Sequence, residues 1–567
     1  TCPQIQMYQD SGYFESKQSG EKIYSQGGKF KIKKAVFDIN AYQEMLVQIL
    51  QLEMTTQLLK FSNSKTNFSA NVQKCINQSS NIYLSKNLSK IEQTRYSSGQ
   101  WSLGIKNKWL MQGPAVQFFA KDCNQKSQID GKNYTELGSI SAQIPGFQWN
   151  QFSKKMLWQL KNISLQSVGS YINDDKLVAN QIKWSLANIA YQNSSKKDSL
   201  QLEKVIVNIQ QVVTPLVHFA TNKMQVVAMD LKTGPLRFSP GKSLYKMAFD
   251  ELKYLQDKNQ AEISRFQLIP KLTKKQFSDQ VKRTIARAEI KLPKGIVRGV
   301  SMKDILDGRF VCASAELQQL RVDLYKDQNI PLQESDLKKM PQVLLKRINL
   351  GLNVPVINVN DAYLRFEGIG KDATKPGVLW FEHINGKVLN AGNMNPNRAL
   401  ELRLSTSFMG EGKMSSVMKF PMNSARNPYY AEFDVGPMPL VRFNVFFAEF
   451  ASIKVDEGKL KSMHITFAGD TALTTTNMTF IYSGLKILLV QREGKKTKEL
   501  LTVAANAVLM EANPSSKTGL RESEVETEFQ SNLFVIGNWM RGFTAAALET
   551  MSPSMSKIFG KRLKRKK

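Results

Sequence analysis

Side chains that could do chemistry are few in this chain. Its 567 residues include three histidines and four cysteines, and no two cysteines stand at a Cys-x-x-Cys spacing. Metal and nucleophile sites usually bring such residues together at short, recognisable spacings. The chain also lacks the His-Glu-x-x-His, Gly-x-Ser-x-Gly and Walker-type motifs. We therefore expect no enzyme activity, no metal and no cofactor, and we interpret His218, His383 and His464 as structural.

Two glycine-rich segments look like phosphate loops at first sight, Gly368–Lys371 and Gly410–Lys413. Each lies between two expected strands without a following helix, so neither has the helix N-terminus that binds phosphate. We interpret both as hairpin turns. Cys75 and Cys123 could form a disulfide in an oxidising compartment or remain free thiols, and both alternatives stay open.

The elements that position these side chains are expected to be strands. Apolar residues alternate with polar ones over residues 400–408, 414–422 and 429–435, and short turns separate the three segments. A period of two with one apolar face is typical of half-buried antiparallel strands. The pattern predicts a β-meander in this region and a mainly β chain.

A second pattern recurs along the chain: two alternating apolar positions, a slip of one residue, and two more. A β-bulge or a bend between strands would produce such a slip. Because 42% of the residues are hydrophobic, the pattern also arises by chance. The six segments are Trp158/Leu160/Ile163/Leu165, Leu200/Leu202/Val205/Val207, Met247/Phe249/Leu252/Tyr254, Leu317/Leu320/Val322/Leu324, Ile357/Val359/Ala362/Leu364 and Phe480/Tyr482/Leu485/Ile487.

Few helices are expected. Thr273 and Gln276 have the spacing of a capping box, followed by a stripe of Phe277, Val281, Ile285 and Ala288. Ser301 begins a short helix that Gly308 ends, and the range Asn40–Lys60 is ambiguous between helix and strand. A helix over Asn532–Thr550 carries an apolar stripe, which either covers the end of a sheet or lies on a membrane surface. The stripe contains Ile536, Trp539, Met540, Phe543 and Ala547.

The chain is strongly basic. It has 78 Lys and Arg against 48 Asp and Glu, a net charge of +30. Such a charge favours polyanionic partners or is simply a solvated lysine-rich surface. We expect anionic lipid rather than nucleic acid, because no stretch interleaves basic residues with aromatic ones as single-strand binders do. The basic tail expected on anionic lipid consists of Lys561, Arg562, Lys564, Arg565, Lys566 and Lys567.

From about residue 290 to the end, several stretches in series resemble the C-terminal region of AsmA-like envelope proteins of the Bacteroidetes type. They include RVDLYKDQNIPL (321–332), LLKRINLGLNVPVINVNDAYLRFEG (344–368), GVLWFEHINGKVLNAGN (377–393), MTFIYSGLKILL (478–489) and FVIGNWMRGFTAAAL (534–548). The resemblance implies an elongated, curled antiparallel sheet with an apolar groove. It also implies a periplasmic protein that an N-terminal segment, absent from this chain, anchors in the inner membrane.

The resemblance further implies outer-membrane homeostasis and non-enzymatic transfer of phospholipid or another anionic lipid. A continuous apolar lining would stabilise acyl chains, at about 0.8 kcal/mol for each buried CH₂. Two alternatives stay open: the apolar faces could close on each other as a sandwich, and the protein could be a structural or adhesive envelope protein with a protein partner. The groove candidates, chosen by alternation, are Ile357, Val359, Leu402, Leu404, Phe480 and Tyr482.

Composition breaks and the onset of the resemblance predict four regions. Residues 1–135 and 136–290 form two β-rich regions, and the second ends in a helix. Residues 291–530 form the AsmA-like β region, and residues 531–567 form the amphipathic helix and the basic tail.

Overall fold

The fold is that of a computed structural model, which describes residues 2–16, 19–39, 45–85, 88–127, 133–173, 176–215, 225–281, 285–330, 339–370, 373, 375–446, 453–489 and 509–552. The chain is mainly β, with 70% strand and 9% helix, and its strands form a curled sheet. This confirms the fold class expected from the alternation. The chain divides into two compact units, unit 1 (Thr1–Lys258) and unit 2 (Asn259–Lys567).

Unit 1 contains sixteen strands and one short 3-10 helix in the described residues. They are β1 (Cys2–Ser16), β2 (Glu21–Ile39), β3 (Met45–Asn63), β4 (Phe68–Leu84), β5 (Leu88–Ser98), β6 (Trp101–Ile105), β7 (Trp109–Gly113), β8 (Val116–Ser127), β9 (Asn133–Gln151), η1 (Phe152–Lys154), β10 (Met156–Asn173), β11 (Lys176–Asn193), β12 (Asp198–Pro215), β13 (Gln225–Thr233), β14 (Leu236–Ser239), β15 (Tyr245–Phe249) and β16 (Glu251–Leu255).

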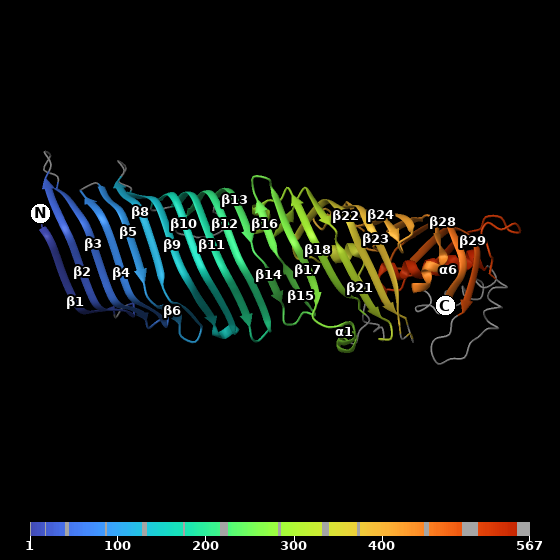
Figure 1. The fold of residues 1–567 in the computed structure, drawn as a ribbon, viewed down its shortest axis with the longest axis horizontal. Coiled ribbons are helices and arrows are strands. Elements are labelled where there is room, and N and C mark those ends of the chain that lie inside the picture. The colour runs from blue at the N-terminus through green and yellow to red at the C-terminus, as the bar shows by residue number, and fades with distance from the viewer. Residues whose placement is uncertain are drawn as a thin grey trace. The chain divides into compact units, whose positions relative to one another are not determined.

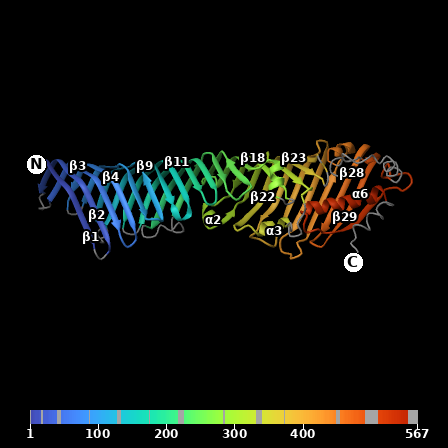
Figure 2. The same cartoon turned by 90° about the horizontal axis from the view of Figure 1, so that it is seen from below.

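Strands of unit 1 follow one another in space in nearly the order of the sequence (Figure 1). Every pairing is antiparallel, and a broken strand such as β5 plus β6 pairs as one strand with β4. Strands of up to 19 residues are long for a globular protein. In Figure 2 the near and far parts of these strands cross in projection, as expected of a curled sheet.

The bends in the long strands coincide with the phase slips of the sequence. Asn162, inside the first slip segment, has a φ of 51°, and the β10–β11 register shifts on both sides of Lys161. Positive φ also occurs within three other slips, at Gln319, Asp361 and Gly484. A bulge bends the strand and adds one residue, so that the apolar positions return to the same face after the bend.

Unit 2 contains the remaining strands, of which β22 pairs in parallel with β19, β20 and β21 and makes the sheet mixed. The strands are β17 (Gln260–Pro270), β18 (Arg287–Arg298), β19 (Arg309–Val311), β20 (Ser314–Gln318), β21 (Arg321–Asp327), β22 (Gly351–Ile369), β23 (Pro376–Gly392), β24 (Ala399–Phe408), β25 (Gly412–Pro421), β26 (Tyr429–Val435), β27 (Met438–Pro439), β28 (Ile453–Gly469), β29 (Leu473–Leu489) and β30 (Glu522–Glu528). The expected meander is confirmed as β24, β25 and β26.

The helices of unit 2 are short except the last. They are α1 (Lys274–Val281), α2 (Met302–Leu306), α3 (Pro341–Lys346), η3 (Leu440–Phe443) and α6 (Val535–Met551). The capping box is confirmed, because the Gln276 backbone N–H donates to Thr273 Oγ1 at 3.3 Å and the Thr273 N–H donates to Gln276 Oε1 at 3.2 Å. The Ser301 hydroxyl likewise caps α2 by accepting from the Asp304 N–H.

Two helix expectations need correction. Helix α1 ends at Val281, so Ile285 and Ala288 do not extend its stripe, and Ala288 belongs to β18 instead. Its buried side chain is Phe277. The ambiguous range Asn40–Lys60 is strand from Met45 onward, and residues 40–44 lie outside the described residues.

Helix α6 contacts strands β28, β29 and β30, and both ribbon views show it beside β28 and β29 (Figures 1 and 2). Trp539 packs among aromatic rings of the sheet, and Gly542 lies so close to Thr476 that a Cβ atom there would collide with the threonine hydroxyl. The helix therefore covers part of one face of the unit 2 sheet. In the described part of the chain, no helix has the length and hydropathy needed to cross a bilayer.

Candidate functional site

One apolar row crosses the whole of unit 1. Residues directly opposite each other on antiparallel strands share a face of the sheet, so the strand register identifies the side chains that line that face. The row is Phe14, Ile23, Phe61, Ala70, Leu103, Met111, Trp149, Trp158, Tyr191, Leu200, Phe238 and Met247. All twelve members are apolar or aromatic. At a strand spacing of about 4.8 Å, the row extends over roughly 50 Å.

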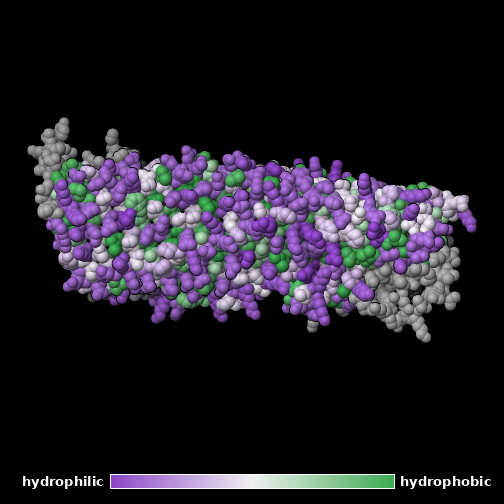
Figure 3. All heavy atoms as spheres, viewed as in Figure 1, coloured by the Kyte–Doolittle hydropathy of each residue, from purple (hydrophilic) through white to green (hydrophobic). Residues whose placement is uncertain are grey.

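The neighbouring row, one residue along each strand, is mainly polar and points to the opposite face. Its middle part is Ser102, Gln112, Gln148, Gln159, Ala190 and Gln201. The side of unit 1 that Figure 3 shows is likewise mostly hydrophilic. The sheet of unit 1 therefore has one apolar face and one polar face.

A second row lies on the same apolar face, beyond the bulges. It is Met7, Phe30, Met54, Asn77, Tyr96, Phe118, Ala142, Leu165, Trp184, Val207 and Leu231. Asn77 is its single strongly polar member. We call the two rows together the apolar face of unit 1.

The side chains of this face are mostly neither buried nor fully exposed. No member of the first row is buried, and the ends of the rows are open, with Phe14 58% and Met7 57% exposed. In the second row, Trp184 is 39% exposed and Met54 is 48% exposed. A packed sandwich core would bury such residues almost completely. Partial exposure over so many strands is instead typical of a surface that can still receive an apolar guest.

Two indole nitrogens on this face have no acceptor. Trp101 and Trp149 Nε1 are shielded from solvent and donate no hydrogen bond to any described residue. Trp101 belongs to the apolar face because it stands two residues before Leu103 on the same strand, and its ring lies 6.1 Å from that of Phe147. Shielded donors normally find a partner. Both N–H groups therefore lie beneath the surface of the face without an acceptor among the described residues.

In unit 2 the structure brings four of the predicted groove residues together on one face. Ile357 and Leu402 lie in one row, joined through Val388. Val359 and Leu404 lie in the next row of that face, joined through Gly386. Ile357, Leu402 and Leu404 are half-buried and Val359 is 8% exposed.

The other two predicted groove residues are covered in this structure. Phe480 is 7% exposed and Tyr482 is fully buried, where burial raises the pKa of its phenol to about 12. Asn513 lies over both, since its amide donates to the Phe480 carbonyl and its backbone pairs with that of Tyr482. These two side chains are therefore packed in the core of unit 2.

The apolar stripe expected on the last helix coincides only in part with the buried face of α6. Trp539 is 5% exposed, Met540 and Phe543 are half-buried, and Ile536 is 63% exposed. The buried face is rotated toward Asn538 and Gly542. The helix was expected either to cover a sheet or to lie on a membrane surface. In the structure it covers the sheet.

Some predicted residues lie outside the described part of the chain, namely His218 and the basic tail Lys561, Arg562, Lys564, Arg565, Lys566 and Lys567. The sequence left open whether Cys75 and Cys123 form a disulfide, and in the structure both are free thiols. Burial raises the pKa of the Cys123 thiol, which makes it a poor nucleophile.

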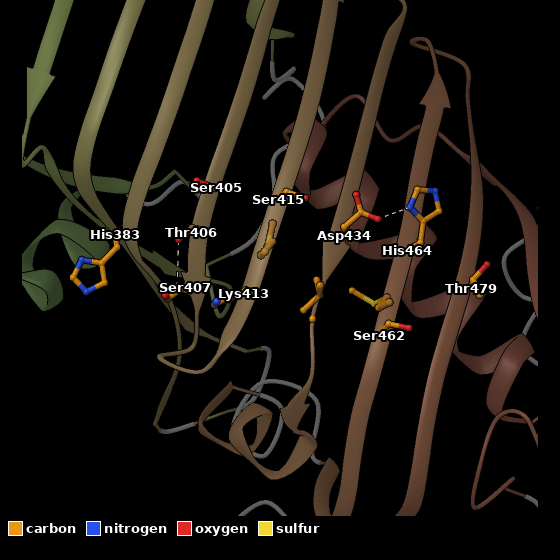
Figure 4. A pocket seen from close by; sticks show the side chains of 14 residues that line it. His383, Ser405, Thr406, Ser407, Lys413, Ser415, Asp434, Ser462, His464 and Thr479 are labelled. Atoms are coloured by element: carbon orange, nitrogen blue, oxygen red, sulfur yellow. Dashed lines mark hydrogen bonds and ion pairs between the residues drawn. The ribbon is translucent and has the colours of Figure 1, made fainter.

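A shallow polar pocket of about 700 Å³ lies on unit 2 and contains the two described histidines (Figure 4). His464 Nδ1 lies 2.7 Å from Asp434 Oδ1, and His383 Nδ1 lies 2.8 Å from Asp361 Oδ1. Asp434 and His464 point away from the face that α6 covers, because Phe433 and Ile465 beside them point toward it. The pocket is therefore on the polar face.

The pocket also borders a group that could hold a cation. Ligand atoms of Glu432, Asp434 and His464 lie within 4.8 Å of one another. The hydrogen bond from His383 lowers the pKa of the Asp361 carboxyl, which keeps that group ionised. Both histidines are largely exposed, and among the described residues the imidazole of each bonds to an aspartate and not to a serine or cysteine. The arrangement is that of surface ion pairs.

No family model and no curated protein matches this chain. Function is therefore inferred from the apolar faces of the two units and the residues around them. The residues of the apolar face of unit 1 were not among the predicted groove residues. The signal that could have found them was present in the slip segments 158–165 and 200–207, which lie on this face.

Proposed function

We propose that the protein is a non-enzymatic lipid-transfer protein, in which acyl chains lie along the apolar face of unit 1 while the head groups stay in water. The observation that carries this proposal is the row of twelve apolar side chains, none of them buried, that crosses unit 1 without interruption. A surface of this length suits extended hydrocarbon better than a compact ligand.

The energetics favour acyl chains. Each CH₂ group removed from water contributes about 0.8 kcal/mol, so a partly shielded chain gains several kcal/mol from a continuous apolar lining. Methionine side chains such as Met54 and Met111 adapt to guests of different shape.

Helix α6 distinguishes the two units in this role. It buries the apolar face of unit 2 at β26 to β29, where Ala431 and Phe467 are at most 4% exposed. Towards β22 the same face is half-buried again at Ile357 and Leu402. The resemblance to AsmA-like envelope proteins favours a periplasmic setting, in which lipid moves between two membranes for outer-membrane homeostasis.

The test uses neighbouring residues on opposite faces of the same strands. The double variant Met111→Glu with Leu200→Glu places two charges on the apolar face, and Gln112→Glu with Gln201→Glu places two charges on the polar face as the matched control. We expect mass spectrometry of gently purified protein to find phospholipid in the wild type and the control, and much less in the first variant.

Wild-type protein without lipid, or equal lipid in both variants, contradicts the proposal. Circular dichroism of each variant checks that the sheet is intact. If the wild type carries no lipid but binds an envelope protein through the same face, a structural or adhesive role replaces lipid transfer.

A further inference from the structure

One long edge of unit 1 is made of hairpin turns that contain lysine and no acidic residue. The five described turns lie at 64–67, 106–108, 152–155, 194–197 and 240–244, along the lower edge of unit 1 in Figure 1. Their eight lysines are all exposed. We call them the lysine rim, which consists of Lys65, Lys106, Lys108, Lys154, Lys155, Lys196, Lys197 and Lys242.

Hydrogen bonds between successive turns hold the rim in a fixed row. The Lys106 N–H donates to the Asn67 carbonyl at 3.2 Å, and the Phe152 N–H donates to the Lys108 carbonyl at 3.0 Å. The Ser194 N–H then donates to the Lys155 carbonyl at 3.1 Å. Adjacent hairpins are two strands apart, about 10 Å, so the five turns present their lysines over roughly 40 Å.

Few acidic side chains stand near this row. Glu21 begins β2 and Asp198 begins β12, and the Asp198 carboxylate already accepts the Gly241 N–H at 2.8 Å. Apart from Lys65, no rim lysine forms an ion pair with a described residue. Positive charge therefore accumulates along this edge.

Aromatic side chains lie among the lysines. A pocket of about 470 Å³ at the rim is lined by Phe68, Trp109 and Phe152 together with Lys106. Phe152 is 44% exposed at the tip of its turn, next to Lys154 and Lys155. Aromatic rings beside lysines are typical of protein surfaces at the interface of a lipid bilayer.

We infer that the lysine rim binds the surface of an anionic phospholipid bilayer. The lysines contact lipid phosphates, and Phe152 and Trp109 enter the interface between head groups and acyl chains. The charge of the rim complements an anionic surface, and its length suits an extended one. The inference does not depend on lipid occupying the apolar face, because the rim lysines lie in the turns and belong to neither row of that face.

The test is sedimentation of the full chain with vesicles of phosphatidylcholine, alone or mixed with phosphatidylglycerol, at low and high salt. The rim variant carries four lysine-to-glutamine changes on two adjacent turns: Lys106→Gln, Lys108→Gln, Lys154→Gln and Lys155→Gln. The control removes the same charge from exposed strand positions: Lys33→Gln, Lys121→Gln, Lys183→Gln and Lys204→Gln.

We expect salt-sensitive binding to the anionic vesicles that weakens about fivefold for each rim lysine removed. The control should lose much less, and Phe152→Ser should weaken binding further without a change of charge. All proteins in the comparison carry the same C-terminal tail, so the tail cannot produce a difference between them.

Equal losses in the rim and control variants would show that only net charge matters and would overturn the inference. The inference would also be overturned if the rim variant bound anionic vesicles as tightly as the wild type does. Tight binding of single-stranded DNA without vesicle binding would assign the rim to nucleic acid instead.

Discussion

The indole of Trp539 stacks on the ring of Phe467, with centroids 5.8 Å apart and an angle of 18° between the planes. Phe433 meets the same indole edge-on at 5.8 Å. This contact fixes α6 on the sheet, so the apolar face of unit 2 is a closed core where the helix lies. The described residues of unit 1 include no such helix, and its apolar face stays half-exposed.

Replacing Trp539 by alanine should undock α6. Removing a buried tryptophan costs about 3–5 kcal/mol of unfolding free energy, measured by urea denaturation of the full chain. Ile536→Ala is the control on the same helix, because Ile536 is 63% exposed and its loss should change stability by less than about 0.5 kcal/mol. Equal destabilisation by both changes would contradict the packing of α6 described here.

Replacing Asn162 by valine should destabilise the bulge of β10. Asn162 has a φ of 51°, where an ordinary L-residue costs about 1–2 kcal/mol and a β-branched one is strongly disfavoured. Asn162→Gly should leave the melting temperature unchanged or raise it. Gln166→Val, at an exposed position of the same strand in regular register with β9, is the control. A valine tolerated equally at both positions would exclude the bulge.

The carboxylate of Glu367 should make unit 2 sensitive to acid. Burial raises its pKa, but hydrogen bonds from Lys274 at 2.7 Å and Arg365 at 2.6 Å outweigh burial and leave the pKa below its ordinary value of 4.5. A lowered pKa stabilises the fold at pH above 4.5, and this contribution is lost as the pH falls through the folded-state value.

The Glu367→Gln variant checks this assignment by thermal melting at several pH values. It should lose roughly 2 kcal/mol near neutral pH, since the amide keeps only one acceptor oxygen and lacks the negative charge that strengthens the hydrogen bonds from Lys274 and Arg365. As the pH falls below about 5, the variant should also lose less stability than the wild type does. The same pH dependence in variant and wild type would assign the acid sensitivity to other groups.

Lipids with brominated acyl chains should quench tryptophan fluorescence if they occupy the apolar face of unit 1. Trp149 and Trp158 stand directly opposite each other in the first row, so Trp149→Phe with Trp158→Phe should remove a large part of the quenching. Trp539→Phe should remove little, because that ring is buried between α6 and the sheet. Quenching that persists in full in the double variant would place the lipid elsewhere.

Strand and bulge positions could be predicted from the sequence because both depend on local patterns. Alternation marks the half-buried strand, and a slip such as that between Leu160 and Ile163 marks the extra residue of a bulge. The buried face of α6 could not be predicted in this way. Asn538 is polar yet buried, since its side chain accepts from the Gln530 N–H at 2.8 Å and donates to the Gln530 carbonyl at 3.1 Å.

The lysine rim and the apolar rows could not be predicted from the sequence for a different reason. Members of each row lie on different strands, and successive turns of the rim lie about forty residues apart in the chain. Alternation within a single strand therefore does not connect them. Only the strand register shows that Lys108 and Lys154, or Leu103 and Met111, are neighbours. The four regions expected from composition stay a prediction beside the two units observed.

The sequential order of the strands has a consequence for how such a molecule can change its length. Each hairpin of unit 1 contacts little beyond its two neighbours, as in solenoid proteins, where stability is nearly a sum of repeat and interface terms. Gain or loss of one hairpin would alter the span by about 10 Å while every remaining row stays in register. Duplication or deletion of a single hairpin can thus change the length of unit 1 in small, regular steps.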